Sequence, residues 1–427
     1  TAVGGGTAAT PAAGASTFQG TIEFWDWAHD PRVALMERLV SEWEQTHAGV
    51  DLKYNPLDWT EIETKILTAA SAGSGPAFSN VHYFWRFEMQ RSGVLAPYPD
   101  DLFNWSQLIS TPYNRDPETG KIYTSDFNWY ADELFFNREL LEAEGIAEDT
   151  IPRNWDDFIR LAQQLTKTDG SGKITQVGFS LNDYWAREWL WMDLIYQQGG
   201  WLWSEDGSEA IWNSEEGVRA LQFIRDVYHT WKVDDPEFLP QGEAFGNGQA
   251  ATYVNMGYTA AGINSEYPQM EGKWSTMVEP TYSGEPLPSW GLQVPEEGFA
   301  VFAKFPDDVK AMAFDFIKFA LGSDDRRIEW ALVMDGPPDV IPLLDAPPIE
   351  ERVTIAAQAE TLPYRIFYGE RPLEAEQLWR TMFDQVVLEG ADPKAVLDDM
   401  TAQMNATLKE TGKRRIIVER NYQPPAA

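Results

Sequence analysis

The feature that most constrains the fold of this chain is an alternation of strand-like and helix-like segments that begins at residue 21. Residues 21–25 are rich in β-forming side chains, and Asp30-Pro31 then supplies an N-cap and a first-turn proline for a helix. Residues 50–54 alternate as a second strand, and Asp58 opens a second helix. This β-α-β-α order predicts a parallel sheet that is covered by helices.

The same order of elements recurs further along the chain. Helices are predicted to begin at Asn154, Ser214 and Asp307, and strands are predicted at residues 174–181 and 250–256. A chain of 427 residues is too long for one ordinary hydrophobic core. We therefore expect an α/β protein with two lobes.

Three interruptions of this pattern indicate where the lobes meet: residues 125–129, 279–288 and 322–325. Three breaks in one chain suggest that each lobe is assembled from separated segments, so that a cleft can open and close about several strands at once. The predicted division is a tether of residues 1–19, an N-terminal lobe of residues 20–127 and 281–322, and a C-terminal lobe of residues 128–280 and 323–427.

The chain carries 67 acidic residues against 33 Lys and Arg, which gives a formal net charge of −34. So much negative charge repels nucleic-acid phosphates and anionic lipid, and neither is expected as a partner. The acids are spread along the chain, and no EF-hand loop is present. A solvated acidic surface therefore explains them better than a calcium site.

Cysteine is absent, which excludes disulfides, thiolate catalysis and cysteine-based zinc or iron–sulfur sites. The four histidines, at positions 29, 47, 82 and 229, are scattered. No Walker A, G-x-S-x-G or G-x-G-x-x-G motif is present, which disfavours NTPases, serine hydrolases and dinucleotide enzymes. We expect no metal centre and no cofactor.

The first 19 residues are mostly Gly, Ala, Thr and Ser and are typical of a flexible tether. They contain no apolar stretch of the kind found in a signal peptide, and no run in the chain approaches the ~20 apolar residues that span a bilayer. A leader of small residues suits an extracytoplasmic protein that is held to a membrane by an N-terminal lipid. A remnant of recombinant expression would look similar.

Seven short phrases follow one another along the chain: residues 22–27 (IEFWDW), 47–50 (HAGV), 92–98 (SGVLAPY), 134–142 (LFFNRELLE), 152–158 (PRNWDDF), 245–251 (FGNGQAA) and 313–319 (AFDFIKF). In this order they resemble the extracellular solute-binding proteins, family 1, a maltose-binding-protein-like family that serves carbohydrate ABC importers. Each phrase alone is weak, whereas seven in family order are a specific signal.

The resemblance implies a type II periplasmic-binding-protein fold, with two α/β lobes, a ligand at their junction and no catalytic step. Two phrases depart from the family pattern. Residues 75–80 lack the usual Pro-Asp-Val, and residues 289–293 stand where a double glycine is usual. Because both lie at expected edges of the cleft, the identity of the ligand does not carry over from the family.

Sugars present apolar C–H faces bordered by hydroxyls, so a site for them needs flat aromatic rings together with planar polar groups. The sequence places this mixture at the ends of predicted strands, where open α/β sheets bind ligands. The candidate ligand-binding residues are Trp25, Asp26, Trp27, His29, Trp85, Arg86, Asn128, Trp129, Asp132, Asp183, Tyr184, Trp185, Asn255, Tyr258, Trp290, Gln293, Tyr368 and Arg371.

Packing is the competing interpretation for several of these residues. Because side chains alternate along a strand, one tryptophan of the first phrase is expected to face the core, and Trp25 is assigned this role while Trp27 meets ligand. Residues 83–87 are interpreted as a buried strand end, from which Trp85 and Arg86 reach the ligand.

Helical spacing raises the same question further along. Trp185 and Trp189 recur one turn apart, which is more often a core stripe than a sugar platform, so Trp189 is predicted to be core while Asp183 and Tyr184 contact ligand. An exposed arginine such as Arg371 more often packs its stem on the surface.

Two further groups of candidates are chosen for other reasons: one lies where the chain is expected to cross between the lobes, and the other rests on the family resemblance. Asn128, Trp129 and Asp132 lie on the predicted crossing strand and would contact ligand from the hinge. Tyr258 occupies the place where the family often has a Gly-Trp platform, and it would serve as the substitute for that tryptophan.

These observations predict an extracytoplasmic binding protein that closes on a small ligand, with carbohydrate as the leading class, and delivers it to the permease of an ABC importer. It is expected to act as a monomer and not as an enzyme. Two alternatives stay open. One is a carbohydrate-active hydrolase with a carboxylate pair, and the other is an adhesive or sensory binding module with the same fold. Neither the particular sugar nor the exclusion of other polar solutes follows from the sequence.

Overall fold

The computed structural model describes residues 18–411 apart from 73, 117–118, 286–290, 296 and 367–371. The strands are β1 (Gly20–Trp27), β2 (Val50–Leu57), β3 (Phe78–His82), β4 (Ser125–Asp126), β5 (Trp129–Asn137), β6 (Lys167–Thr168), β7 (Ile174–Gln176), β8 (Thr252–Met256), β9 (Trp274–Val278), β10 (Gly291–Pro295), β11 (Glu297–Val301) and β12 (Arg365–Ile366). The helices are α1 (Asp30–Glu44), α2 (Trp59–Ser71), α3 (Tyr83–Arg91), α4 (Thr111–Asn114), α5 (Arg138–Ala143), α6 (Trp155–Leu165), α7 (Tyr184–Tyr196), α8 (Glu215–His229), α9 (Gln241–Gly246), α10 (Thr259–Glu266), α11 (Asp307–Leu321), α12 (Asp324–Met334), α13 (Pro347–Glu350), α14 (Val353–Thr361), α15 (Leu373–Leu388) and α16 (Pro393–Thr411).

The first lobe is built on a five-stranded sheet in the order β2-β1-β3-β11-β4. β1 pairs parallel with β2 and β3, as the sequence pattern predicts, whereas β11 pairs antiparallel with β3 and β4. One face of the sheet is a stack of aromatic rings, in which Phe24, Phe78 and Phe299 pack together and Phe316 of α11 covers them. The predicted parallel sheet is therefore confirmed for its first three strands.

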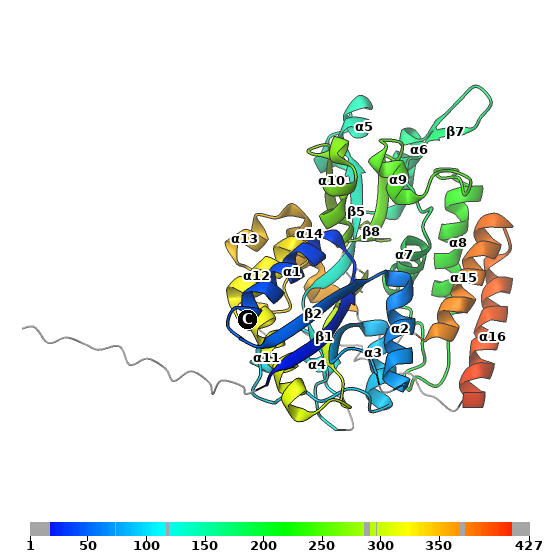
Figure 1. The fold of residues 1–427 in the computed structure, drawn as a ribbon. Coiled ribbons are helices and arrows are strands. Elements are labelled where there is room, and N and C mark those ends of the chain that lie inside the picture. The colour runs from blue at the N-terminus through cyan, green and yellow to red at the C-terminus, as the bar shows by residue number, and fades with distance from the viewer. Residues whose placement is uncertain are drawn as a thin grey trace, which may run out of the picture.

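The second lobe has a sheet in the order β12-β10-β5-β8, with β9 also paired to β5. β5 is buried along its whole length, and its partners β8, β9 and β10 run antiparallel to it. α7 packs against β8 and β10, and α8, α15 and α16 pack on one another (Figure 1). The expected architecture of two α/β lobes is thus confirmed.

The chain passes between the sheets at neighbouring places. It leaves the first sheet after β4 and enters the second at β5, within the predicted break at residues 125–129. It returns between β10 and β11, because β10 still pairs with β5 while β11 pairs with β3. This return lies further along the chain than the boundary predicted between residues 280 and 281. The division into lobes stays a prediction. A third segment, residues 335–340, runs beside the start of β5, where Asn128 bridges Pro338.

Helix caps follow the sequence closely. The side chains of Asp58, Asn154 and Ser214 each accept a hydrogen bond from a backbone N–H in the first turn of α2, α6 and α8, as predicted. At α1 the prediction is wrong by one residue: the helix begins at Asp30, and His29 is the N-cap without a side-chain hydrogen bond.

Two predicted strands are shorter in the structure. β3 ends at His82, so residues 83–87 are not a strand end but the first part of α3, where the side chains of Tyr83, Trp85 and Phe87 are buried. Of residues 174–181 only 174–176 form a strand, and the remainder makes single bridges at Val177 and Ser180.

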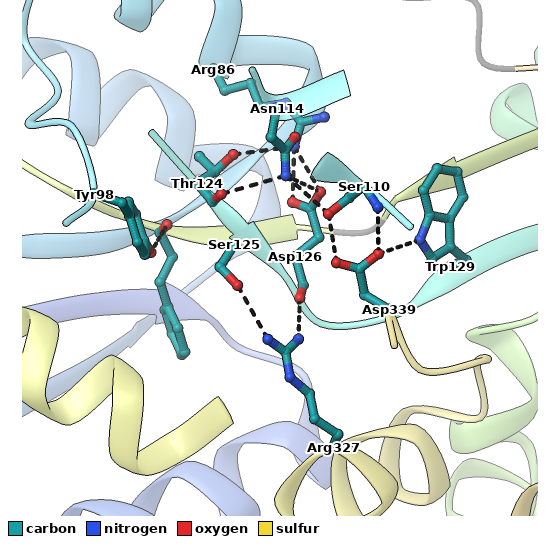
Figure 2. A network of polar contacts seen from close by, with 11 residues as sticks. Arg86, Tyr98, Ser110, Asn114, Thr124, Ser125, Asp126, Trp129, Arg327 and Asp339 are labelled. Atoms are coloured by element: carbon teal, nitrogen blue, oxygen red, sulfur yellow. Dashed lines mark hydrogen bonds and ion pairs between the residues drawn. The ribbon is translucent and has the colours of Figure 1, made fainter. Parts of the chain in front are cut away.

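A buried polar network holds the first crossing (Figure 2). Arg86 of α3 donates to both carboxylate oxygens of Asp126, at 2.9 and 3.1 Å, and Asn114 donates to one of them at 2.8 Å. Arg327 of α12 donates to the backbone carbonyl of Asp126 at 2.7 Å. These four side chains are at most 4 % exposed. Asp126 therefore joins β4 to three other segments at the point where the chain leaves the first sheet.

Asp339 completes this network on the third segment. Its carboxylate accepts from the backbone N–H and the hydroxyl of Ser110, at 2.7 and 2.5 Å, and from the indole of Trp129 at 2.7 Å. Burial raises the pKa of Asp339 to about 7. Beside it, the amide of Asn128 donates to the carbonyl of Gly336 at 2.6 Å. Residues 335–340 and the start of β5 are thus held together.

Replacing Asp126 by asparagine is expected to destabilise the protein strongly. The variant leaves the buried guanidinium of Arg86 without a counter-charge, and breaking a buried pair in this way costs about 3–5 kcal/mol in the free energy of unfolding. Denaturant titration of Asp126→Asn measures this loss. Asp157→Asn is the matched control, because it breaks the exposed pair with Arg160 and should change stability little. Equal losses in the two variants would contradict the assignment.

Candidate ligand-binding cleft

A cavity lies between the two lobes, and both contribute to its lining. The space inside it is about 540 Å³, part of which is open to solvent. The lining residues are Trp27, Trp59, His82, Tyr83 and Glu297 from the first lobe and Trp185, Trp189, Met256, Tyr258 and Val294 from the second.

The first-lobe side of the cavity follows from the sheet topology. β1, β2 and β3 run parallel, so their carboxyl ends meet at one edge of the sheet. Trp27 is the last residue of β1, Trp59 opens α2 directly after β2, and His82 ends β3. Glu297 begins β11 and pairs in register with His82. Residues far apart in the sequence are therefore neighbours here.

The second-lobe side is built from three elements. Met256 ends β8, and Tyr258 follows it at the N-cap of α10. Trp185 and Trp189 lie one turn apart on α7, and Val294 belongs to β10. Because β8 and β10 both pair with β5, these side chains gather at one end of the second sheet.

Aromatic rings form a continuous lining from one lobe to the other. The ring centroid of Trp27 lies 5.5 Å from that of Trp59 and 6.1 Å from that of Tyr258. Tyr258 is 6.4 Å from Trp189, which in turn is 5.7 Å from Trp185. These rings offer flat apolar faces to whatever occupies the cavity.

A buried ion cluster lies beneath this lining in the first lobe. Arg32 of α1 pairs with Asp26, at 2.7 Å, and with Glu297. Asn80 donates to both carboxylates, at 3.0 and 3.1 Å. All four side chains are at most 1 % exposed. Glu297 belongs both to this cluster and to the cavity lining, so it connects the two.

Two residues of the cavity lining each carry a polar atom that makes no hydrogen bond among the described residues. The Oε1 atom of Glu297 and the indole Nε1 of Trp189 are buried and have no hydrogen-bond partner among them. Buried polar atoms are nearly always hydrogen-bonded in folded proteins. The arrangement therefore suits a ligand that supplies both a donor and an acceptor.

Three of the predicted ligand contacts, Trp27, Trp185 and Tyr258, line the cavity. Two others lie directly beside them. His29 stacks on Trp27, with 4.9 Å between ring centroids, and Tyr184 meets Trp185 at 5.2 Å. Their contact with a ligand stays a prediction.

The first strand differs from expectation in which residue faces the core. Trp25 and Trp27 are two positions apart and therefore share one face of β1, so the prediction that one of them enters the core is wrong. Asp26, which lies between them, faces the core and is neutralised there by Arg32. Trp25 is half-buried, and its indole donates to Glu23 at 2.9 Å.

Two candidates on α3 lie outside the lining. The ring of Trp85 is buried behind Trp59, at 5.3 Å between centroids. Arg86 is engaged with Asp126 in the network of Figure 2. Because residues 83–87 are helical, their side chains spread around a helix axis instead of alternating toward the cleft.

Candidates near the crossing and in the second lobe also have structural partners. Asn128 and Trp129 bond to the third segment. Asp183 accepts from a backbone N–H as the N-cap of α7. Asn255 donates to Gln241 at 3.1 Å. None of these four lines the cavity as described.

The remaining candidates are only partly described. Trp290, Tyr368 and Arg371 lie outside the described residues, and so does the side chain of Gln293, whose backbone pairs with Ala131 in β10 and β5. Their contact with a ligand stays a prediction.

Sequence reasoning did not select seven of the lining residues: Trp59, His82, Tyr83, Trp189, Met256, Val294 and Glu297. Trp59 carried a usable signal, because it directly follows a predicted strand. Trp189 is predicted as core, yet the face of α7 that it shares with Trp185 is the one that meets the cavity. Glu297 carries no local signal, since only the register of β11 against β3 brings it to the site.

Asp132 belongs to a separate group of buried carboxylates that are not part of the cavity lining. One carboxylate oxygen from each of Asp132, Asp193 and Glu279 lies within 4.8 Å of the other two. Among the described residues, this is the group whose spacing would allow it to hold a metal ion. Gln197 donates to Glu279 at 2.8 Å. Burial raises the pKa of Asp132 to about 7 and that of Glu279 well above its ordinary value, so protons remove part of the charge. A Cβ at Gly291 would come within 2.7 Å of Asp193, so glycine permits this close approach.

Comparison with known proteins identifies the class to which this fold and cleft belong. The model of the bacterial extracellular solute-binding protein family matches residues 28–326. The chain therefore belongs to the bacterial extracellular solute-binding proteins, and it is a binding protein of the extracytoplasmic space. No helix among the described residues is long and apolar enough to cross a bilayer.

Curated relatives match parts of the chain. A putative binding protein of Brucella abortus is 26 % identical over 137 residues, which are 31 % of this chain and 33 % of that protein. A putative ABC transporter periplasmic-binding protein of Escherichia coli is 18 % identical over 247 residues, 55 % of each chain. The chain thus spans about a third to a half of the length of these relatives.

Solved structures share the whole fold. An ABC transporter solute-binding protein of Thermotoga lettingae, bound with α-D-tagatose, has a TM-score of 0.77 and 19 % identity over 91 % of this chain and 99 % of its own. The GacH receptor of Streptomyces glaucescens, solved unliganded and with acarbose, has a TM-score of 0.77 and 20 % identity over 92 % and 99 %. The maltose/maltodextrin-binding domain of Bdellovibrio bacteriovorus, bound to maltotriose, has a TM-score of 0.76 and 17 % identity over 92 % and 100 %. At such identities the likeness establishes the type II periplasmic-binding-protein fold.

His29, beside the cavity, is expected to stay neutral far into the acidic range. Burial, helped by the nearby Arg32, lowers the pKa of its imidazole from 6.5 to about 4. Between these pH values the unfolded chain binds more protons than the folded protein, so the folded state loses stability as the pH falls from 6.5 and the loss is complete near pH 4. A titration of the histidine Cε1–H resonances by NMR measures the midpoint.

The resonance of His29 is assigned by its loss in the His29→Gln variant. A midpoint near 6.5 for that resonance would show that the imidazole is solvated and would contradict the packing against Trp27.

Proposed function

We propose that this protein captures a sugar in the cleft between its lobes and delivers it to an ABC importer. The observation that carries the proposal is the continuous aromatic lining, which joins the lobes from Trp59 through Trp27 and Tyr258 to Trp189. Flat rings bind the C–H faces of a pyranose or furanose, and the unused groups of Glu297 and Trp189 suit its hydroxyls.

The solved relatives support the same class of ligand. Proteins with this fold are described as bound with tagatose, with maltotriose and with acarbose. This support concerns the class of ligand.

Closure of the cleft is the proposed mechanism. A ligand that touches Trp27 on one lobe and Tyr258 on the other gains more contacts when the lobes are closed, so it shifts the population toward the closed form. The crossings at β4–β5 and β10–β11 would take up the rotation. The permease of the importer then recognises the closed form.

Anchoring and assembly belong to the same proposal. The small-residue segment at residues 1–19 would act as a tether to a lipid at the membrane surface, and the protein would work as a monomer. An adhesive or sensory role would use the same cleft and differ only in the partner that recognises the closed form.

The hydrolase alternative receives less support from the cavity. Glycoside hydrolysis needs two carboxyl groups on either side of the scissile bond, about 5–10 Å apart. Among the described lining residues Glu297 is the one carboxylate, and the carboxyl group nearest to it in the ion cluster, Asp26, is bound to Arg32 and Asn80.

A thermal-shift screen against monosaccharides and oligosaccharides tests the proposed function. A sugar that raises the melting temperature should also make the protein more compact in small-angle X-ray scattering, and it should be recovered unchanged after prolonged incubation. Release of shorter sugars would favour the hydrolase, and stabilisation without compaction would contradict closure.

Trp27→Ala and Tyr258→Ala are each expected to weaken binding of such a sugar at least tenfold, which corresponds to about 1.4 kcal/mol. Each variant removes one aromatic face from the cavity. Isothermal titration calorimetry measures the affinity. Both side chains are only half-buried, so the melting temperature should change little.

Trp105→Ala is the matched control, since Trp105 is also half-buried but packs with Leu108 and Val340 away from the cavity. Wild-type affinity in the Trp27 or Tyr258 variant would remove that residue from the site.

A further inference from the structure

The ion cluster beneath the cavity is not balanced in charge. Asp26 and Glu297 supply two carboxylates, and Arg32 between them supplies one guanidinium. Asn80 and Tyr54 add hydrogen bonds to the cluster but no charge. A buried negative charge without its own partner is costly, so a cluster of this composition is relieved either by a proton on a carboxylate or by one further cation.

The unpaired part of the cluster lies at Glu297. Arg32 and Asn80 both bind the Oε2 atom of this residue, and Oε1 is buried without a partner among the described residues. Asp26, in contrast, is bound at both oxygens by Arg32, Asn80 and Tyr54. Burial raises the pKa of Glu297, which reflects the cost of its charge in these surroundings. Glu297, the carboxylate with fewer hydrogen bonds, is therefore also the one of the two that lines the cavity.

The walls of the cavity are suited to the same kind of ligand. Four tryptophans and two tyrosines face it, namely Trp27, Trp59, Trp185, Trp189, Tyr83 and Tyr258. The faces of such rings carry negative charge and attract cations, with tryptophan the most effective of them. An aromatic enclosure with a carboxylate at its base recognises a positively charged nitrogen by both effects together.

Two basic groups near the cavity, His29 and Arg380, do not supply this cation. His29 is neutral at ordinary pH, because burial lowers its pKa to about 4. Arg380 lies over the ring of Tyr184, at 3.6 Å from its centroid, and is paired with Glu376 at 2.7 Å. Its charge is therefore already matched outside the cavity.

We propose that the preferred ligand carries a protonated amine, so that the solute is an amino sugar whose ammonium group donates to Oε1 of Glu297. The sugar ring then lies against the aromatic faces, and one of its oxygens accepts from Nε1 of Trp189. The inference rests on the proposed capture of a sugar and narrows its chemical class. Glu297 sets the preference, and the tryptophans supply affinity that a neutral sugar shares.

Matched sugars test this preference directly. Fully deacetylated chitobiose and cellobiose have the same β-1,4-linked rings and differ in carrying ammonium or hydroxyl groups at C2. Glucosamine with glucose and galactosamine with galactose extend the comparison to single rings and to a second stereochemistry. Calorimetry at pH 6 and low salt should show at least one amine that binds tenfold or more tightly than its neutral counterpart. N,N′-diacetylchitobiose, which keeps the nitrogen but not its charge, should bind like the neutral sugar.

The Glu297→Gln variant should abolish this difference. Its amide keeps the shape of the side chain and removes the charge, so affinity for the amine should fall at least tenfold more than affinity for the neutral sugar. Glu139→Gln on the exposed face of α5 is the control for loss of one negative charge and should behave as wild type. The wild-type comparison stands by itself should the Glu297 variant fail to fold.

The outcomes separate this inference from the proposed function. Neutral sugars that bind as tightly as every amine in the panel would overturn the inference and leave sugar capture intact. An amine preference that survives in Glu297→Gln would overturn the role of Glu297. If no sugar, neutral or amine, binds the folded wild-type protein, both the inference and the proposed function are overturned.

Discussion

The cleft depends on one buried arginine. Arg32 rises from the first turn of α1 and holds the carboxylates of Asp26, in β1, and Glu297, at the start of β11. Its guanidinium lies 4.8 Å from the ring centre of Phe127, beside the first crossing. A planar group with five donors can hold two carboxylates at once, which a lysine in the same place would do less well. Arg32 therefore connects the edge of the first sheet, the cavity lining at Glu297 and the first crossing.

Two kinds of contact join the lobes, and they differ in how easily they separate. The polar network around Asp126 and Asp339 holds the start of β5 against the first lobe, whereas ring contacts such as that of Trp27 with Tyr258 join the lobes at the cavity. Buried charged networks resist rearrangement because each broken bond leaves an unpaired group, but aromatic edges separate at small cost. In the proposed closure, a ligand that enters between the rings would replace ring contacts between the lobes and keep this network unbroken.

Local patterns predicted what depends on local geometry. The caps at Asp58 and Asn154 and the parallel pairing of β1 with β2 follow from neighbouring residues, and all are observed. Trp27 and Tyr258 were found because aromatic residues at strand ends mark a cleft in this type of fold. Glu297 could not be found in this way, since its position depends on an antiparallel register with β3 that no short segment encodes. The assignment of Trp25 to the core failed for a simpler reason, because residues two apart share a face.

Affinity and selectivity have different physical sources in this cavity. Aromatic faces gain from any apolar surface of suitable shape, so exchange of one sugar for another alters their contribution only modestly. A buried acceptor behaves differently, because a ligand that leaves it without a donor forfeits about 1–3 kcal/mol, and more when the acceptor is charged. The cavity combines several rings with one incompletely bound carboxylate, so under the proposal above many sugars would fit it and Glu297 would decide among them. The surplus of negative charge over the whole chain acts in the same direction, since it raises the local concentration of cationic solutes near the cleft.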